Sequence, residues 1–217
     1  MVYDTTDYTR HSSLELVTRE IAERNIQGCI AEFGVYRGDF AKLINECFPN
    51  NKFYLFDTFK GFDSCDLKKE KEQNLLLPHH HPPNHTQLSK KHTRAASFKA
   101  KDFFFAGDFT NTSVDLVLNK MPYPENCIIK KGYFPDTAKD IDECFAFVSI
   151  NTDLYEPIYQ GLCWFYPRLL RGGYIFVHDY NCIQYRGIKE AGFRFSRENN
   201  APFFPLSDAG GSVIFMK

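Results

Sequence analysis

The chain has 217 residues, a formal net charge of −1 and 24% charged residues. This length fits one domain, because single α/β domains of this size are common. The near-zero net charge argues against nucleic acid or an acidic membrane surface as the main partner. We expect a cytoplasmic protein without membrane insertion, since no run approaches about 18 apolar residues and residues 1–10 lack the apolar core of a signal peptide.

The cysteines argue for a reducing compartment. There are seven, an odd number, with no CxxC spacing, and several adjoin apolar residues. This pattern favours small buried thiols over disulfides or a zinc site. The residues are Cys29, Cys47, Cys65, Cys127, Cys144, Cys163 and Cys182.

The first part of the chain predicts a helix followed by the opening of a βαβ unit. Ser12, with Glu15 at capping-box spacing, predicts the start of an amphipathic helix. Residues 29–35 form a predicted strand that runs into a glycine turn, and residues 39–48 a helix closed by Pro49. A second strand, residues 52–57, ends in Asp57.

A long polar insertion, about residues 63–108, then interrupts the alternation of strands and helices. Residues 63–101 are rich in Lys, Glu, His, Pro and Gln and have no sustained apolar period. Segments of this length are usually lids, binding loops or disordered, and we expect a lid. Its histidines are a candidate metal cluster, but a polar lid segment is favoured because nothing fixes a geometry. They are His79, His80, His81, His85 and His92.

The rest of the chain completes one α/β domain spanning residues 1–217. Helices are predicted at 114–118, 158–170 and 188–198, and strands at 127–131, 146–150, 172–177, 202–205 and 212–216. The sequence therefore predicts a Rossmann-like, doubly wound, mostly parallel seven-stranded sheet with an antiparallel closing strand and helices on both faces.

Two of the predicted strands end in polar residues that can hold a metal. Asn151 and Asp153 follow one strand, and His178 and Asp179 follow the other. Ligands bind at the carboxyl ends of parallel strands, so we expect these four side chains to converge. Their oxygen and nitrogen atoms could hold Mg²⁺ or Mn²⁺. Alternatively, Asn151 and Asp153 cap the next helix, and His178 is a strand-end histidine with satisfied nitrogens.

The glycine turn at residues 32–38 predicts a nucleoside site. Gly34 permits a tight turn, the helix after Gly38 offers free N–H groups, and Asp57 at the next strand end is placed to bind both ribose hydroxyls. The alternatives are glycines needed only for packing and a capping or solvated Asp57. A third glycine and a P-loop are missing, which disfavours nicotinamide cofactors and phosphates and favours S-adenosylmethionine.

Several ordered segments together resemble the macrocin O-methyltransferase (TylF/MycF) family, over nearly the whole chain after Ser12 except the insertion. They are Ala31–Gly38, Tyr54–Phe62, Lys131–Thr137, Asp153–Pro157, and Tyr166–Leu169 with Gly172-Gly173 and Asp179-Tyr180. Members of this family methylate sugar hydroxyls of macrolide and aminocoumarin antibiotics with S-adenosylmethionine, and characterised ones need Mg²⁺. Relatives are linked to surface glycans, and members often associate, so a homo-oligomer is left open.

Carried across residue by residue, the resemblance implies a cofactor site. Residues of the glycine turn would line the methionine end, Asp57 would hold the ribose, and Gly132 and Tyr133 would lie near the adenine. The predicted cofactor contacts are Glu32, Phe33, Gly34, Val35, Tyr36, Gly38, Asp57, Thr58, Phe59, Gly132, Tyr133 and Asn151.

The chain departs from the acidic pattern of the family at two positions. Asn151 replaces its first acid and His178 the first acid of its later pair, while Asp153 and Asp179 stay in register. Asp179, His178 and Asn151 are the metal candidates, and the loss of two carboxylates should weaken an Mg²⁺ site. Asp153 is the favoured catalytic base. His178 is the alternative base, because imidazole titrates near neutral pH.

The sequence thus favours an S-adenosylmethionine-dependent O-methyltransferase. Its partner would be a small-molecule or glycan acceptor, such as a sugar hydroxyl of a natural product or a surface glycan. The lid would close over the acceptor and exclude water. The alternative is a non-catalytic S-adenosylmethionine-binding module or partner subunit in which Asn151 and His178 mark an eroded site.

Overall fold

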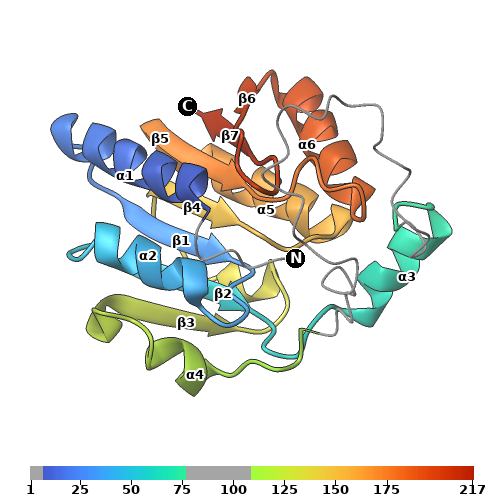
Figure 1. Cartoon of the computed structure of the whole chain (residues 1–217), viewed down its shortest axis with the longest axis horizontal. Helices are drawn as coiled ribbons and strands as arrows, with labels where there is room; N and C mark the ends of the chain where they lie inside the picture. The colour runs from blue at the N-terminus through green and yellow to red at the C-terminus, as the bar shows by residue number, and fades with distance from the viewer. Residues whose placement is uncertain (1–6, 77–108) are drawn as a thin grey trace.

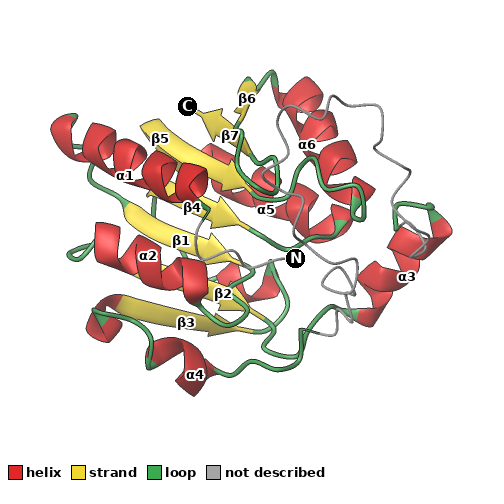
Figure 2. Cartoon of the chain, in the orientation of Figure 1, coloured by secondary structure: helices red, strands yellow, loops and turns green. Residues whose placement is uncertain are grey.

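The computed structural model describes residues 7–76 and 109–217. A seven-stranded sheet runs through this part of the chain in the order β3-β2-β1-β4-β5-β7-β6, with helices on both faces (Figures 1 and 2). Strand β7 is antiparallel to β5 and β6, and the other pairings are parallel. The predicted fold class is confirmed. The strands are β1 (Cys29–Phe33), β2 (Phe53–Asp57), β3 (Cys127–Lys131), β4 (Phe145–Ile150), β5 (Leu169–Val177), β6 (Phe203–Pro205) and β7 (Val213–Met216).

The helices divide the core into two layers. Helices α1 (Tyr8–Glu23), α2 (Asp39–Cys47) and α4 (Val114–Leu118) bury apolar residues against one face of the sheet. Helices α5 (Tyr155–Arg168) and α6 (Arg186–Asn199) cover the other face. Neighbouring β4 residues alternate between the layers, Phe147 on the α1 side and Val148 on the α5 side. Covered on both faces, the central strands are continuously apolar, which is why they are visible in the sequence.

Most predicted elements lie close to their expected positions. Helix α4 and strand β3 have the predicted bounds, and α6 extends the predicted helix at both ends. The predicted start of the first helix is wrong. Helix α1 begins at Tyr8 because Asp7 caps it, accepting from Arg10 N at 3.2 Å. Ser12 lies inside the helix, where its hydroxyl donates to the Thr9 carbonyl oxygen at 3.2 Å.

The start of the predicted insertion contains a helix that its polar composition concealed. Helix α3 (Ser64–Glu72) is capped by Asp63, which accepts from Cys65 N at 2.8 Å. Its Asp66 and Glu70 side chains are buried, so tertiary polar contacts stabilise a helix with little apolar surface. The expectation of an irregular segment is therefore wrong for Ser64–Glu72. The five histidines and the rest of residues 77–108 lie outside the described residues.

The cysteine prediction is confirmed only in part. All seven cysteines are free thiols, but only Cys29 is buried, and Cys65, Cys144 and Cys163 are exposed. The expectation of buried thiols is thus wrong for these three, because sequence adjacency to apolar residues does not fix which way a side chain points. Within residues 7–76 and 109–217, no helix is long and apolar enough to cross a membrane.

Candidate functional site

The predicted polar turns lie side by side at the carboxyl ends of the central strands. Phe33 of β1 pairs with Ile150 of β4, which pairs with Val177 of β5, so these three strands end level. Backbone hydrogen bonds continue past the strand ends. Asn151 N donates to the Phe33 carbonyl oxygen at 2.8 Å, and His178 N to that of Ile150 at 2.9 Å. The parallel register therefore brings together turns that are far apart in sequence.

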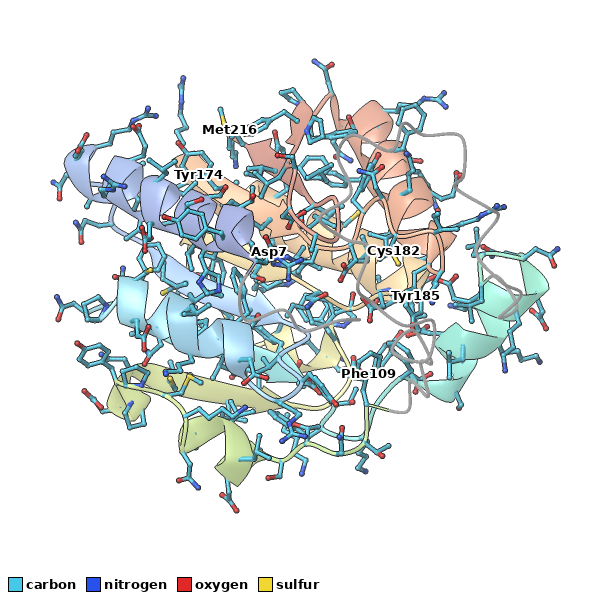
Figure 3. All side chains as sticks on the ribbon, viewed as in Figure 1. Asp7, Phe109, Tyr174, Cys182, Tyr185 and Met216 are labelled. Carbon is cyan, nitrogen blue, oxygen red and sulfur yellow. The ribbon has the colours of Figure 1, made fainter. Side chains whose placement is uncertain are left out.

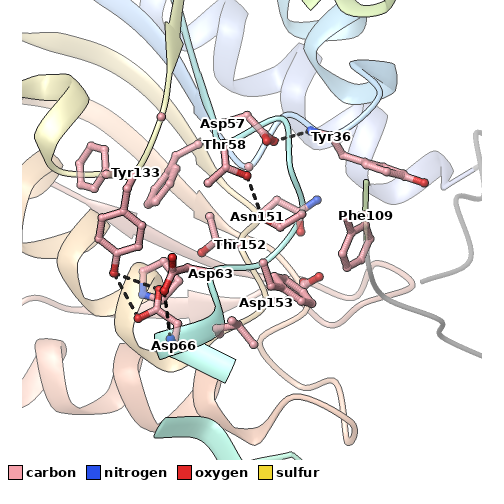
Figure 4. Close-up of a pocket in the computed structure, with 18 residues that line it drawn as sticks. Tyr36, Asp57, Thr58, Asp63, Asp66, Phe109, Tyr133, Asn151, Thr152 and Asp153 are labelled. Atoms are coloured by element: carbon pink, nitrogen blue, oxygen red, sulfur yellow. Dashed lines mark hydrogen bonds between the residues drawn. The ribbon is translucent and has the colours of Figure 1, made fainter. Parts of the chain in front are cut away.

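An open pocket adjoins these turns, with about 690 Å³ of empty space including solvent at its mouth. Figure 4 shows the side chains that surround it. The wall consists of Phe33, Gly34, Tyr36, Asp57, Thr58, Gly61, Phe62, Asp63, Asp66, Phe109, Gly132, Tyr133, Phe134, Asn151, Thr152, Asp153, Leu154 and Pro157.

Gly34 allows the first turn to approach the turn after β4. Its φ angle is +91°, and a Cβ there would lie 2.6 Å from the Asn151 carbonyl carbon, closer than real Cβ contacts. Gly38, also left-handed with φ +77°, precedes α2 as its N-cap and leaves the first helical N–H groups without a side-chain cap. The turn therefore presents backbone donors at the edge of the sheet, as expected for a site that binds a carboxylate.

Asp57 is fixed in the pocket wall by the backbone of two neighbouring turns. Its Oδ2 accepts from Tyr36 N at 2.8 Å (Figure 4), and its Oδ1 accepts from Phe59 N at 2.7 Å. Burial raises the pKa of this carboxyl, and the backbone donors partly oppose that shift. Each oxygen keeps a further lone pair for a ligand hydroxyl, so both oxygens are oriented to accept from a vicinal diol.

Helix α3 forms a wall of the pocket opposite the β3 turn. Tyr133 OH donates to both carboxylate oxygens of Asp66, at 3.1 and 3.0 Å (Figure 4). Asp63 and Asp66 line the pocket, and neither was a predicted site residue. The available signal was Asp63 as a helix cap followed by an acid three residues later, a helix-start pattern inside an otherwise polar segment.

Aromatic rings line the mouth of the pocket. Phe109 makes edge contacts with Tyr36 at 5.0 Å and with Phe62 at 4.9 Å between ring centroids. Tyr36 OH also donates to Asn111 Oδ1 at 2.5 Å, which ties the first turn to the chain before α4. Phe62 and Phe109 were not predicted site residues either. A lone phenylalanine in a polar stretch carries no sequence signal that separates a pocket wall from a core contact.

Asp153 lines the pocket and has an unsatisfied oxygen. The residue is 3% exposed, has a left-handed φ of +61°, and lines the pocket, yet its Oδ1 has no hydrogen-bond partner. Burial, together with the negative charge of Asp179, raises the pKa of this carboxyl well above its ordinary value. A buried carboxylate oxygen without a donor is costly unless a ligand supplies one.

His178 follows the neighbouring strand but does not line the pocket. Its Nε2 lies 2.9 Å from Ser149 Oγ and its Nδ1 3.4 Å from Ser212 Oγ. The ring packs edge-on against Phe40 at 4.9 Å and is 1% exposed. Burial, with a smaller contribution from Arg10, lowers the pKa of His178 well below its ordinary value. This placement matches the interpretation of a strand-end histidine with satisfied nitrogens.

The predicted cofactor residues divide into two sets. Eight of them line the pocket, namely Phe33, Gly34, Tyr36, Asp57, Thr58, Gly132, Tyr133 and Asn151. Glu32, Val35, Gly38 and Phe59 do not contribute to its wall. Glu32 is 1% exposed, and burial, together with the charge of Asp57, raises its pKa well above the ordinary value. Its assignment as a cofactor contact stays a prediction.

The side chains at the strand ends do not fit a tightly bound Mg²⁺. Among the described residues, no group of three or more His, Cys, Asp or Glu side chains could hold a metal ion. Asn151 Oδ1 and Asp179 Oδ2 lack hydrogen-bond partners, but both nitrogens of His178 face serines. The Arg10 guanidinium also lies near Asp179, where it opposes a second cation. One amide and two carboxylates beside a resident cation are a weak set for Mg²⁺.

The site geometry agrees with a comparison against protein families. Residues 123–216 match the family model described as Macrocin-O-methyltransferase (TylF). The predicted family resemblance is thereby confirmed over the part of the chain that runs from η2 (Pro124–Asn126) to β7. The glycine turn and Asp57 precede the matched range, so their assignment depends on the geometry above. A comparison with curated proteins gives no match.

Solved structures with the same fold include named methyltransferases. The O-methyltransferase NovP is 16% identical, with a TM-score of 0.67, and the match covers 96% of this chain and 79% of that one. The calicheamicin methyltransferase CalS11 is also 16% identical, with a TM-score of 0.64 and the same coverage. Its apo structure, described as a TDP-rhamnose 3'-O-methyltransferase, is 15% identical with a TM-score of 0.60. At these identities the likeness establishes the fold.

Proposed function

We propose that the protein is an S-adenosylmethionine-dependent O-methyltransferase in which Asp153 removes the proton from the acceptor hydroxyl. The observation that carries this assignment is that Asp153, whose buried Oδ1 has no hydrogen-bond partner, lines the same pocket as the Asp57 carboxylate. The acceptor hydroxyl would donate to Asp153, which both orients it and takes its proton. The family match over residues 123–216 supports the same activity.

The lining residues favour one direction for the cofactor in the pocket. Asp57 would hold both ribose hydroxyls, the Gly132–Tyr133 wall with Asp66 would face the adenine, and the turn after β1 would hold the methionine end. S-adenosylmethionine carries no phosphate, in agreement with a glycine turn that lacks a pyrophosphate cradle. This direction leaves the sulfonium methyl on the Asp153 side of the pocket.

The proposed step balances without a further reactant. The acceptor oxygen forms its bond to the methyl carbon while the carbon–sulfur bond breaks, and the sulfur takes the electron pair and becomes a neutral thioether. The hydroxyl proton passes to Asp153. The sulfonium already supplies a good leaving group, so the chain's own residues mainly position the hydroxyl, accept its proton and exclude water.

The acceptor class follows from the family and from the named structural neighbours. The family model is described as Macrocin-O-methyltransferase, and CalS11 as a TDP-rhamnose 3'-O-methyltransferase. We therefore propose that the acceptor is a sugar hydroxyl of a natural product or a surface glycan. We also propose that residues 63–108 form an insertion in a single domain, and that α3, at the start of this segment, contributes Asp66 to the pocket. His178 is the less favoured base, because it is buried and faces two serines.

Two measurements test this proposal. Isothermal titration calorimetry with S-adenosylhomocysteine should give one binding site per chain, and labelled S-adenosylmethionine should transfer its methyl group to TDP-sugars or isolated glycans. In Asp153→Ala, turnover should be lost while S-adenosylhomocysteine still binds. Loss of turnover in His178→Ala but not in Asp153→Ala would overturn the assignment of the base. A non-catalytic binding module would bind the cofactor and transfer nothing to any acceptor.

A further inference from the structure

Helix α3 is fixed against the elements that carry the site. Its Glu70 accepts a hydrogen bond from Tyr155 N at the start of α5. Beyond the helix, Leu76 forms an antiparallel bridge with Tyr185, which lies beside α3 in Figure 3. These contacts hold α3 in place, so the part of the pocket wall that it supplies has a defined shape.

The carboxylate that α3 adds to this wall keeps acceptor capacity for a ligand. Asp66 lines the pocket and is 3% exposed. Tyr133 OH donates to its Oδ1 at 3.1 Å and to its Oδ2 at 3.0 Å (Figure 4). Lys69 lies in the same helix, but its ammonium pairs with Glu156 at 3.3 Å. A carboxylate has about four acceptor positions, and one shared hydroxyl hydrogen leaves most of them open to the donors of a ligand.

Tyr133 presents an acceptor to the pocket as well. Burial, together with the Asp66 carboxylate, raises the pKa of Tyr133, so the hydroxyl keeps its hydrogen and directs it to Asp66. The Tyr133 oxygen can then only accept from a ligand. Phe33 and Phe134, whose ring centroids are 4.4 Å apart, also line the pocket. This part of the wall thus suits a flat heterocycle that carries an N–H donor and disfavours one that carries a carbonyl oxygen in the same place.

The same wall adjoins the proposed ribose position. Asp57 at the end of β2 pairs with Lys131 of β3, and Gly132 N donates to the Asp57 carbonyl oxygen at 2.9 Å. Tyr133 therefore follows directly after the residue that is bonded to Asp57. A purine attached to a ribose on Asp57 would meet Tyr133 and Asp66 with one of its edges. In adenine the 6-position carries an amino group, which is a donor, whereas 6-oxopurines carry an acceptor oxygen there.

We propose that Asp66 is a specificity-determining residue that selects adenine over 6-oxopurines by accepting a hydrogen bond from the 6-amino group of the cofactor, with Tyr133 as its positioning residue. This inference rests on the proposed S-adenosylmethionine-dependent function. The alternative explanation is structural: the Asp66–Tyr133 hydrogen bonds only link α3 to the turn after β3. A purely structural link would affect the affinity of every purine ligand equally, so the ratio of affinities separates the two explanations.

Three ligands that differ at the 6-position of the purine test the proposal on the wild-type protein. They are S-adenosylhomocysteine, S-inosylhomocysteine with an oxygen in place of the amino group, and the analogue with hydrogen in that place. In calorimetry S-adenosylhomocysteine should bind most tightly, S-inosylhomocysteine about 10- to 100-fold more weakly, and the 6-hydrogen analogue between the two. Equal affinity for S-adenosylhomocysteine and either analogue would overturn the proposal. A wild-type protein that binds none of the three would overturn the proposed function, and this inference with it.

Substitutions then assign the selectivity to the residue. Asp66→Asn keeps the size and an acceptor for Tyr133, but its amide can also donate to a 6-oxo group, so the affinity ratio should fall to within about threefold. Tyr133→Phe should lower the ratio in part, because Asp66 loses the donor that orients it.

Asp63→Asn is the matched control for the loss of a carboxylate from the same wall. Asp63 also lines the pocket, and its Oδ1 accepts from Cys65 N at 2.8 Å. Asparagine caps a helix as well as aspartate does, so Asp63→Asn should keep the wild-type ratio. A folded Asp66→Asn protein with the wild-type ratio would overturn the proposal, and so would an Asp63→Asn protein whose ratio falls as far as that of Asp66→Asn.

Discussion

Replacing Asp153 by asparagine should raise stability while it removes activity. The side chain is buried, its Oδ1 has no partner, and it lies beside the negative charge of Asp179. An uncharged amide of the same size removes the like-charge repulsion, and its N–H₂ group becomes a donor for the neighbouring carboxylate. The φ of +61° favours this exchange further, because asparagine tolerates the left-handed region well.

The magnitude follows from the cost of an uncompensated buried charged or polar group. Relief of about 1–3 kcal/mol corresponds to a rise in Tm of roughly 3–10 °C for a domain of this size. The same substitution removes the proposed proton acceptor, whose contribution to rate is about 100- to 10,000-fold. We therefore expect a more stable protein that binds S-adenosylhomocysteine normally and transfers almost no methyl groups.

The assays are thermal unfolding at pH 8 and labelled methyl transfer in the same buffer. Asp136→Asn is the control, since this exposed acid pairs with Lys139 at the surface and its loss should change Tm little. An Asp153→Asn protein with wild-type turnover would show that Asp153 is not the base. A lower Tm would show instead that its carboxylate is satisfied in the folded protein, contrary to the unpartnered Oδ1.

Three further substitutions test the rest of the site. Asp57→Asn should weaken S-adenosylhomocysteine binding by roughly 10- to 100-fold in calorimetry, because one charged acceptor is lost. Since burial raises the pKa of Asp57, the affinity of the wild type should fall on acidification as this carboxyl protonates. The affinity of Asp57→Asn should not show this pH dependence. Glu70→Gln should lower turnover and cost about 0.5–2 kcal/mol in denaturant unfolding, because this carboxylate accepts from Tyr155 N at the start of α5, just after Asp153. Gly34→Ala should cost about 2 kcal/mol or more and lower cofactor affinity, since φ is +91° and the new Cβ would meet the Asn151 backbone.

Each of these substitutions has a matched control in the chain. Asp140→Asn removes an exposed acid that pairs with Lys130 and should not alter cofactor binding. Glu72→Gln tests charge loss on the exposed side of α3, where Glu72 pairs with Lys68. Gly161→Ala adds a methyl group inside α5 without a positive φ; its nearest contact is the pocket residue Phe33, at 3.1 Å, so it controls for the left-handed backbone of Gly34 and not for contact with the site. If these controls lowered stability, cofactor affinity or turnover as much as the site variants do, the position of the site residues would not explain the effects.

The sheet could be predicted from the sequence because its strands are covered on both faces. Continuous apolar runs such as Ala146–Ile150 mark such strands without any knowledge of their partners. The polar ends of two strands could be placed together for the same reason, since parallel register fixes where they meet. Helix boundaries were less predictable, because Ser12 and Asp7 offer caps of similar quality one turn apart and only the structure shows which is used.

The residues that were missed act through contacts that periodicity does not encode. Helix α3 has no useful apolar face, and its position depends on Asp66 accepting from Tyr133 and on Glu70 fitting against Gly187, where a Cβ would lie 2.8 Å from Glu70 Oε2. His178 attracts attention as a candidate ligand, but the two serines that satisfy its nitrogens come from β4 and from the residue before β7. A sequence shows donor types, not which partners they meet.

Charge compensation connects these observations into one account of the site. The acidic strand ends are retained at Asp153 and Asp179, but the adjoining positions carry Asn151 and His178, which lowers the negative charge that a metal would have to balance. Burial raises the pKa of Asp179 and Arg10 lowers it, but Asp208 and Asp7, which pair with Arg10, raise it, so Arg10 leaves little surplus positive charge at the strand ends. Restoring both acids, as Asn151→Asp with His178→Asp, should therefore supply two further carboxylate ligands and produce Mn²⁺ binding in calorimetry that the wild type lacks.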